Sequence, residues 1–367
     1  MNDRERLLTL LNGDPPDRVP WFGDLDYWAA AMEHRGEVPA NFRGSEAYFE
    51  LHRELRVGFY LQGYWPFQTI YDDTVTVRDW QEGHDRYRSI HTPVGDLREK
   101  CTFLPESATE ARTEHLIKSP EDLSVLRYIY EHTTYAPDYA EAERRRGLVE
   151  DIGVVLCYAP KSPLMQLVAL DAGIEAVTDC VLAGEDEFRE TLRVMEAKLN
   201  EAMDVALACP AECLMIPENL SSEVVGKRFF EDYMRACHEK WTARIREAGK
   251  FSFIHMDGTL RGLLAEEGSV GFTVLEALTP SPVGDLTISD MRELAGPDPI
   301  IWGGVPGIYF TPLVSDEAFD GLVREVLEVM RGEPRYVLGV ADQVPPDGLR
   351  DRVQRVAALA EEYGQYR

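Results

Sequence analysis

The sequence predicts an α/β fold: a (β/α)8 TIM barrel built from one domain over residues 1–367, with a β-hairpin insertion at about 70–105. From about residue 150, short apolar segments of strand length alternate with amphipathic helical segments, and this alternation gives a parallel sheet. The chain length and the succession of these units favour a closed barrel over an open sheet. Residues 73–104 instead alternate polar and β-favouring positions, which predicts antiparallel hairpins.

In the N-terminal part, residues 4–11 and 45–58 have the pattern of amphipathic helices. The first of these ends at Asn-Gly-Asp-Pro-Pro, and the apolar segment 18–23 (RVPWFG) then predicts a short buried strand. Residues 119–130 predict another helix, with acidic side chains in its first turn. These elements supply the first units of the barrel and the return from the insertion.

The segment 58–71 (GFYLQGYWPFQTIY) is dense in aromatic residues. One interpretation is a core segment beneath a long insertion. The other is the wall of a pocket for a flat or aromatic ligand, because aromatic side chains line such clefts. In the second interpretation, Tyr64 and Trp65 bind the substrate.

The second half of the chain is regular. Continuous apolar strands, as expected for a buried parallel sheet, are followed by helices. The predicted strands are 152–158, 213–216, 251–255, 272–277, 299–303 and 336–340. The predicted helices are 163–172, 185–207, 227–248, 259–266, 287–295, 316–330 and 349–363.

Composition excludes several classes of protein. There are 38 Lys and Arg against 65 Asp and Glu, a net charge of −27, so a surface for nucleic acid or for an anionic membrane is not expected. The start of the chain has no apolar signal region, and no long apolar run spans a bilayer, so we expect a cytoplasmic protein. The six cysteines are scattered and predict reduced thiols. Neither a GxGxxG nor a P-loop motif is present.

The stretch 251–258 (FSFIHMDG) is the centre of the predicted site. Alternation along a strand places His255 and Asp257 on the same side, with Met256 opposite. An imidazole and a carboxylate at the tip of a strand can bind a metal or act as acid and base. They can equally form a structural ion pair that holds a loop.

Polar residues follow the other predicted strands at equivalent positions, and in a parallel barrel the carboxyl ends of the strands meet at one rim. Carboxylates with a single imidazole suit a hard or borderline divalent metal better than thiolate chemistry does. For any one of these residues, a helix cap or a loop carboxylate is the ordinary alternative. The set consists of Asp24, Asp26, Tyr158, Lys161, Glu218, Asn219, His255, Asp257, Glu276, Asp342 and Gln343.

Four stretches together resemble the uroporphyrinogen decarboxylase superfamily. They are RERLLTLLNGDPPDRVPWFG at the start, DTVTVRDW with RYRSIHTPVGDL in the insertion, IHMDG, and YVLGVADQVPPDGLRDRVQ near the end. The insertion and the last stretch are similar to the branch of corrinoid-dependent methyltransferases and O-demethylases. The resemblance covers nearly the whole chain and implies a single barrel domain of that family. It also suggests a homodimer.

The chain departs from that family at two places. Decarboxylases of the superfamily carry an arginine-rich loop after the first strand, where this chain has GDLDYW. Acidic and aromatic side chains cannot clamp a polycarboxylate, so the usual porphyrinogen is not the expected substrate. Zinc methyltransferases carry His-x-Cys-Gly where this chain has IHMDG. The resemblance therefore implies zinc or another divalent metal held by Glu218, His255, Asp257 and Asp342.

Two functions are predicted. In the first, a metal-dependent methyltransferase or demethylase moves a methyl group between a small methylated substrate and a corrinoid on a partner protein, with Asn219 and Gln343 binding the substrate. In the second, a cofactor-free carboxy-lyase acts on a tetrapyrrole or other carboxylate. Asp24 or Asp26 then stabilises a protonated intermediate, and His255 or Tyr158 donates the proton. A third interpretation, a binding barrel without catalysis, predicts no convergent polar groups.

Overall fold

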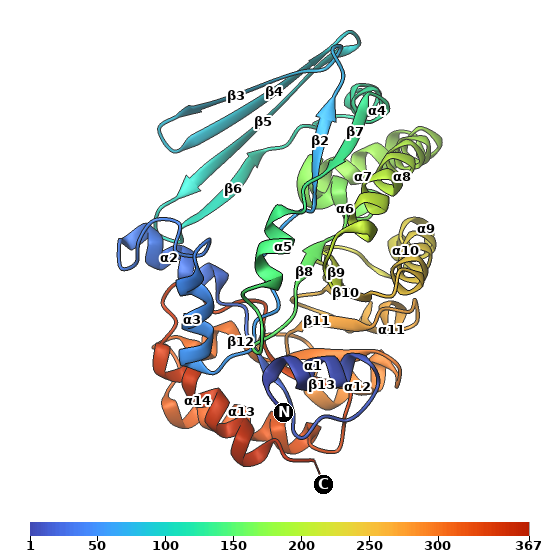
Figure 1. Cartoon of the computed structure of the whole chain (residues 1–367). Helices are drawn as coiled ribbons and strands as arrows, with labels where there is room; N and C mark the ends of the chain where they lie inside the picture. Colours follow the sequence, from blue (N-terminus) through green and yellow to red (C-terminus); the bar gives the residue numbers. More distant parts are fainter. Residues whose placement is uncertain (367) are drawn as a thin grey trace. The chain divides into compact units, whose positions relative to one another are not determined.

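A computed structural model describes residues 1–366. The chain forms two compact units. The first unit contains Met1–Tyr64, Ala140–Tyr158 and the chain from Pro210 onward, and the second contains Trp65–Tyr139 and Ala159–Cys209. Figure 1 shows the elements of both.

The first unit is built on a parallel sheet of seven strands in the order β1-β13-β12-β11-β10-β9-β8. Strands β8 to β13 are neighbours in the sheet as they are in the chain, and β1 pairs with β13, so the sheet curls back toward its start. The strands are β1 (Trp21–Phe22), β8 (Leu156–Tyr158), β9 (Cys213–Ile216), β10 (Phe251–His255), β11 (Val274–Leu278), β12 (Ile300–Pro306) and β13 (Tyr336–Ala341).

A short segment between β1 and β8 extends the curl. Phe22 forms an isolated parallel bridge with Gly58, and Phe59 forms one with Gly153. The amide of Gly58 donates to the carbonyl of Trp21 at 3.1 Å, and the amide of Phe59 donates to that of Ile152 at 2.8 Å. Backbone pairing therefore continues past β1 and reaches the chain that leads into β8.

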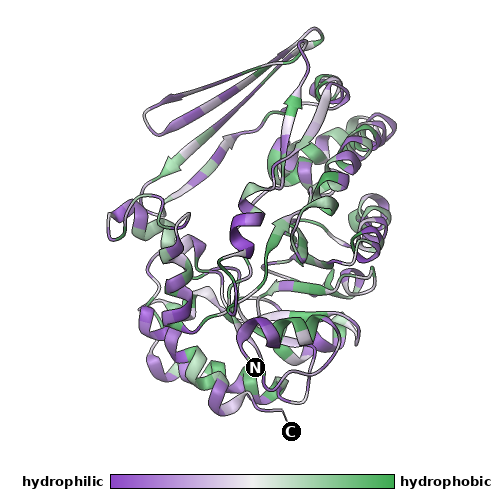
Figure 2. Ribbon diagram, viewed as in Figure 1, coloured by the Kyte–Doolittle hydropathy of each residue, from purple (hydrophilic) through white to green (hydrophobic). Residues whose placement is uncertain are grey.

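Helices connect the strands, and α10, α12, α13 and α14 contact β10, β12 and β1. Figure 2 shows apolar strands beside helices that carry many hydrophilic residues. This is the pattern expected where both faces of a parallel sheet are covered. The helices are α1 (Asp3–Leu11), α2 (Asp26–Arg35), α3 (Glu46–Leu55), α5 (Ala140–Arg146), α9 (Lys227–Tyr233), α10 (Arg235–Glu247), α11 (Leu264–Gly268), α12 (Ile288–Ala295), the 3₁₀ turn η2 (Gly307–Phe310), α13 (Asp316–Met330) and α14 (Arg350–Tyr363).

Aromatic side chains fill part of the core of the first unit. Trp302 on β12 contacts the rings of Tyr60, Phe22 and Phe253 at centroid distances of 4.4, 5.4 and 5.7 Å. All four side chains are buried. The four rings form a tightly packed layer, and this layer limits the movement of the polar residues at the strand ends.

The second unit contains the antiparallel pair β2 (Phe67–Tyr71) and β7 (Thr133–Pro137). It also contains a four-stranded antiparallel sheet, formed by β3 (Thr76–Glu82), β4 (Asp85–Thr92), β5 (Gly95–Leu104) and β6 (Thr109–Glu114). Its helices are α4 (Asp122–Glu131), α6 (Pro163–Gln166), the π-helical turn η1 (Leu167–Asp171), α7 (Gly173–Ala183) and α8 (Glu185–Ala208).

Three helices have no counterpart among the predictions from sequence, and one of them is α5. Another is α2, whose Asp-Tyr-Trp start was interpreted as a loop carrying site residues. The third is α7, which begins at Gly173, a residue with a backbone φ of 77°. A glycine normally marks the end of a helix, and here it separates a π turn from the next helix.

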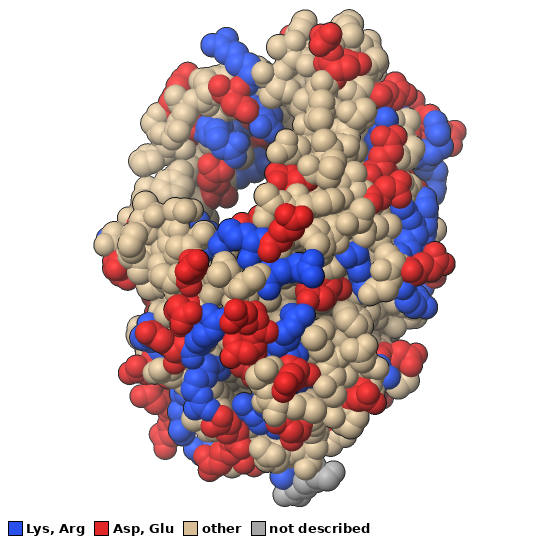
Figure 3. Space-filling model, in the orientation of Figure 1, with Lys and Arg blue, Asp and Glu red and all other residues tan. Residues whose placement is uncertain are grey.

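The surface mixes acidic and basic side chains on the face that Figure 3 shows. Cys101, Cys157, Cys180, Cys209, Cys213 and Cys237 are all buried and form no disulfide. Within residues 1–366, no helix combines the length and the hydrophobicity needed to cross a membrane.

Candidate functional site

His255 is the last residue of β10, and its ring lies beside the carboxylate of Glu276 on the neighbouring strand β11. The Nδ1 atom of His255 is 2.6 Å from Oε2 of Glu276. Glu276 is fully buried and His255 is nearly so. Parallel register places the two residues directly opposite each other, which is how the sequence creates this pair.

Tyr60 holds the other oxygen of the same carboxylate. Its hydroxyl donates to Oε1 of Glu276 at 2.6 Å, and its ring is buried against Trp302. Glu276 therefore accepts one hydrogen bond at each oxygen, from Tyr60 and from His255. We call His255, Glu276 and Tyr60 the proton triad.

The protonation of His255 follows from its neighbours. Burial alone would lower the pKa of its imidazole, but the charge and hydrogen bond of Glu276, together with Asp257 and Asp342, raise the pKa to about 9. The ring is therefore an imidazolium at neutral pH, with both nitrogens protonated. Such a group is suited to donating a proton.

Asp342 lies on the outer side of His255. Its Oδ1 atom is 3.7 Å from Nε2 of His255, and about half of its side chain is exposed. Burial raises the pKa of Asp342 while the charge of His255 opposes this effect. Nε2 of His255 thus faces a more open region, from which a substrate can approach the ring.

Asp24 and Asp26 follow β1. Asp24 is buried and accepts from the amide of Asp26 at 2.8 Å, while Asp26 pairs with Arg43 at 2.9 Å. Burial, with the charges of Asp26, Asp342 and Glu276, raises the pKa of Asp24 well above its ordinary value. Asp24 is thus a buried acid close to the proton triad, whereas Asp26 is held by an arginine.

Tyr158 ends β8, and its amide donates to the carbonyl of Tyr64 at 2.8 Å. Burial, then the charges of Asp24 and Glu276, raises the pKa of the Tyr158 hydroxyl, which stays neutral. The ring of Tyr64 lies 5.4 Å from the guanidinium of Arg145. Tyr158 therefore belongs to the same acidic neighbourhood, and Tyr64 contacts it through the backbone.

Three residues at strand ends have a left-handed backbone although they are not glycine. They are Asn219 after β9, Ala277 within β11 and Asp342 after β13, with φ of 53°, 67° and 73°. Such conformations cost roughly 1–3 kcal/mol each and concentrate at functional sites. All three lie at or near the carboxyl ends of strands, the edge that carries the active site in barrel enzymes. The same kind of backbone also occurs elsewhere in the chain, at Asn41, Arg56, Ala108 and Glu150.

Glu218 makes a different contact from the one predicted. Its Oε1 atom is 2.9 Å from Nε2 of His238 on α10, and Nδ1 of His238 is 3.1 Å from Oε2 of Glu267 on α11. All three side chains are fully buried. Burial lowers the pKa of His238, but the two glutamates raise it to about 10, so this buried group is an ion cluster.

The predicted metal ligands can be compared with this geometry. In residues 1–366, no three His, Cys, Asp or Glu side chains are arranged so that they could hold a metal ion. Glu218 is hydrogen-bonded to His238, and Nε2 of His255 lies 3.7 Å from Oδ1 of Asp342. The metal site formed by Glu218, His255, Asp257 and Asp342 stays a prediction.

A surface cavity of about 470 Å³ is lined partly by residues that are close in sequence to His255 and Glu276. Asp257, Asp342 and Gln343 line it, together with Tyr27 and the turn at Gly307. Asn219 is exposed after β9. Of the predicted substrate-binding residues, Gln343 thus lines a cavity of the first unit, whereas Trp65 belongs to the second unit.

Three residues of the ion cluster and the proton triad are difficult to recognise from sequence. His238 and Glu267 lie on helices, and their contacts with Glu218 and with each other form the buried ion cluster. Tyr60 was one of several aromatic residues in the segment 58–71. The signal that distinguishes it is its position in the short segment that pairs between β1 and β8.

Comparisons with known proteins give the fold. No protein-family model matches the chain, and no curated protein sequence matches it. Among solved structures, a methyltransferase from Methanosarcina mazei is similar, with a TM-score of 0.65, 13% sequence identity, and coverage of 99% of each chain. The chain therefore has the barrel-like α/β fold of that protein over nearly its whole length.

Proposed function

We propose that this chain is a methyltransferase that moves a methyl group between a small methylated substrate and a corrinoid carried by a partner protein. The observation that carries the proposal is the proton triad at the carboxyl ends of the strands, with His255 protonated at neutral pH. The structural likeness to a methyltransferase supports it at the level of the fold.

In the demethylation direction, the bond between the methyl carbon and an oxygen or sulfur of the substrate breaks. The corrinoid of the partner protein would supply the acceptor of the methyl group. His255 donates the proton from Nε2 to the departing heteroatom, which leaves as a neutral alcohol or thiol. Glu276 then stabilises the ring through Nδ1, and Tyr60 fixes Glu276.

The buried layer of aromatic side chains around Trp302 has a role in this reaction. Tyr60 packs on Trp302, so the carboxylate of Glu276 cannot rotate away from the imidazole. An acid held in one orientation loses less entropy when the substrate arrives. Asp342 sits on the open side of His255 and is the side chain that an incoming substrate displaces.

The metal and the closed barrel are two further proposals. Zinc binding stays a prediction, and no step above depends on it. Elemental analysis of purified protein tests it, with one ion per chain as the predicted result. We also propose that segment 58–60 is the remaining strand of an eight-stranded barrel, which the bridges at Gly58 and Gly153 support.

A carboxy-lyase is the second candidate, and the environment of Asp24 favours it. This acid is buried and its pKa is raised well above the ordinary value, so it is protonated more readily than a surface aspartate. With His255 or Tyr158 as proton donor, Asp24 could stabilise a protonated intermediate. This reaction would release CO₂ and would need no partner protein.

The product distinguishes the two candidates. The chain is incubated with cob(I)alamin as a corrinoid probe and with dimethyl sulfide or anisole as methyl donor, and the absorbance of methylcobalamin is followed. We expect methylcobalamin to form with the natural chain and to form much more slowly with His255→Gln. Failure of both donors, together with release of labelled CO₂ from a carboxylate panel, would replace the methyltransferase proposal by the lyase.

A further inference from the structure

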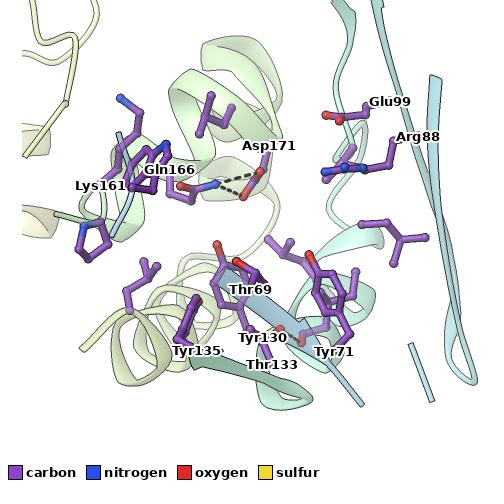
Figure 4. Close-up of a pocket in the computed structure, with 18 of the residues that line it drawn as sticks. Thr69, Tyr71, Arg88, Glu99, Tyr130, Thr133, Tyr135, Lys161, Gln166 and Asp171 are labelled. Carbon is purple, nitrogen blue, oxygen red and sulfur yellow. Dashed lines mark hydrogen bonds between the residues drawn. The ribbon is translucent and has the colours of Figure 1, made fainter. Parts of the chain in front are cut away.

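The second unit contains a cavity of about 430 Å³ that no step of the proposed function uses. Figure 4 shows how its side chains lie. Strand pair β2 and β7 and helix α4 contribute Tyr71, Tyr130 and Tyr135, and strands β4 and β5 contribute Arg88 and Glu99. Opposite them, η1 contributes Asp171. This volume is within the range of small-molecule sites.

Asp171 is a buried carboxylate in the wall of this cavity. Both of its carboxylate oxygens accept from Nε2 of Gln166 at 3.1 Å. Among residues 1–366, no Lys, Arg or His side chain forms an ion pair with Asp171. Each carboxylate oxygen can accept more than one hydrogen bond, so Asp171 retains capacity for a donor inside the cavity.

The two arginines of the cavity are engaged with other carboxylates. Arg88 holds Asp79 through two hydrogen bonds of 2.8 and 2.9 Å. Arg112 pairs with Glu99 at 3.4 Å and also donates to the carbonyl of Leu170. Neither guanidinium therefore forms an ion pair with Asp171. Burial raises the pKa of Asp171 to about 7, although Gln166 and the charge of Arg112 oppose this effect, so the carboxylate is charged at pH 8.

The tyrosines provide the rest of the surroundings. Burial raises the pKa of Tyr71, Tyr130 and Tyr135, so their rings are neutral phenols. Phenol rings attract cations over their faces, because the ring quadrupole is negative there. A carboxylate together with several tyrosines is the chemical environment that recognises an organic cation.

The backbone at Asp171 is also unusual. Leu167–Asp171 is a π-helical turn, and a single π turn within helical structure is often found at functional sites. The amide of Ile117 donates to the carbonyl of Asp171 at 2.8 Å. The side chain is thus fixed at the cavity wall by its own backbone and by Gln166.

We propose that this cavity binds a small organic ammonium ion, with its nitrogen at Asp171 and its hydrocarbon body against Tyr71, Tyr130 and Tyr135. The proposal is independent of the methyl-transfer site, because every residue named here belongs to the second unit. Either proposal can fail without the other.

Three probes of similar size and different charge test it: benzylammonium, benzyl alcohol and benzoate. Their dissociation constants for the full chain are measured by titration calorimetry near pH 8. We expect benzylammonium to bind at least about tenfold more tightly than benzyl alcohol, a difference of roughly 1.4 kcal/mol. Benzyltrimethylammonium as a fourth probe separates a hydrogen-bonded primary ammonium from a cation held by the rings alone.

Asp171→Asn keeps the shape of the side chain and removes its charge, so it should abolish the preference for benzylammonium. Asp179→Asn is the matched control, because Asp179 is exposed on the adjacent helix α7. Equal binding of benzylammonium and benzyl alcohol by the natural chain would overturn the proposal. Tighter binding of benzoate would overturn it too, since Lys161 or Arg88 would then govern the cavity. If Asp171→Asn does not fold, the comparison of probes on the natural chain still decides.

Discussion

At the scale of single residues, the proton held by His255 is determined by carboxylates on two sides. Glu276 accepts from Nδ1 and Asp342 lies near Nε2, and together with Asp257 they raise the pKa of the imidazole to about 9. A general acid is active only while it is protonated. The proposed reaction therefore depends on pH in a direction that the structure determines.

If His255 is the acid, kcat for demethylation should be constant from about pH 7 to 8 and should fall as pH rises through about 9. Glu276→Gln removes the negative charge that raises the pKa, so its falling limb should move to lower pH. A pH profile of both proteins measures this shift. A merely structural role for Glu276 would lower kcat at every pH and leave the shape of the profile unchanged.

His238 has a structural role of the same chemical kind. Its pKa is raised from 6.5 to about 10 between Glu218 and Glu267, so the folded state binds its proton more tightly than the unfolded state. The stability that this provides is fully present below pH 6.5 and is lost as pH rises through about 10. Urea unfolding between pH 6 and 11 checks this direction.

His238→Gln should lower the free energy of unfolding by about 3–5 kcal/mol, because it leaves two buried carboxylates without their cation. His91→Gln is the control, since His91 is highly exposed beside Asp96. Equal effects of the two substitutions would show that the buried cluster adds nothing to stability.

The residue scale also shows what sequence could predict about the site. His255, Asp24 and Asp342 were named because they follow predicted strands, and parallel strands end at one edge. The pairing of His255 with Glu276 follows from register, which the sequence does not specify. Glu218 was predicted to be a metal ligand, and its contact with His238 depends on a helix packing that no local pattern reveals.

At the scale of elements, the segment 58–60 joins the two ends of the curled sheet with few hydrogen bonds. Gly153 forms the backbone bridge with Phe59 that connects this segment to the chain leading into β8. A Cβ atom there would lie 1.7 Å from the backbone carbonyl oxygen of Phe59, so any side chain must separate the two segments.

Gly153→Ala should therefore destabilise the chain by at least about 1–3 kcal/mol, the usual cost of forced overpacking. Gly321→Ala in α13 is the control, because no atom lies within 4 Å of its added Cβ. That substitution should stabilise the helix by about 0.5–1 kcal/mol. Thermal unfolding of both variants measures the contrast, and a neutral Gly153→Ala would show that the ends of the sheet do not need this contact.

Elements were predictable where the apolar pattern is continuous. The strands at 213–216 and 251–255 and the helix at 316–330 have the bounds that the sequence predicts. Helices α2 and α7 were missed, because acidic, aromatic and glycine residues at their starts indicate loops. Segment 58–60 has too few paired residues to produce a strand signal of its own.

At the scale of the whole molecule, the net charge of −27 opposes folding through self-repulsion. Raising the ionic strength from about 0.01 to 0.15 M shortens the Debye length from about 30 to about 8 Å. The melting temperature should therefore rise with NaCl over this range. A melting temperature that falls would mean that surface ion pairs, such as Arg355 with Asp320, contribute more than repulsion costs.

The central claim concerns proton donation during methyl transfer, and one comparison tests it most directly. The rate of methylcobalamin formation from anisole and from 4-nitroanisole is measured with the natural chain and with His255→Gln. The 4-nitrophenolate group leaves without needing a proton, whereas phenolate gains greatly from one. We predict that His255→Gln lowers the rate with anisole by about 10²–10⁴-fold and the rate with 4-nitroanisole much less. Equal losses for the two donors would contradict the assignment of His255 as the acid.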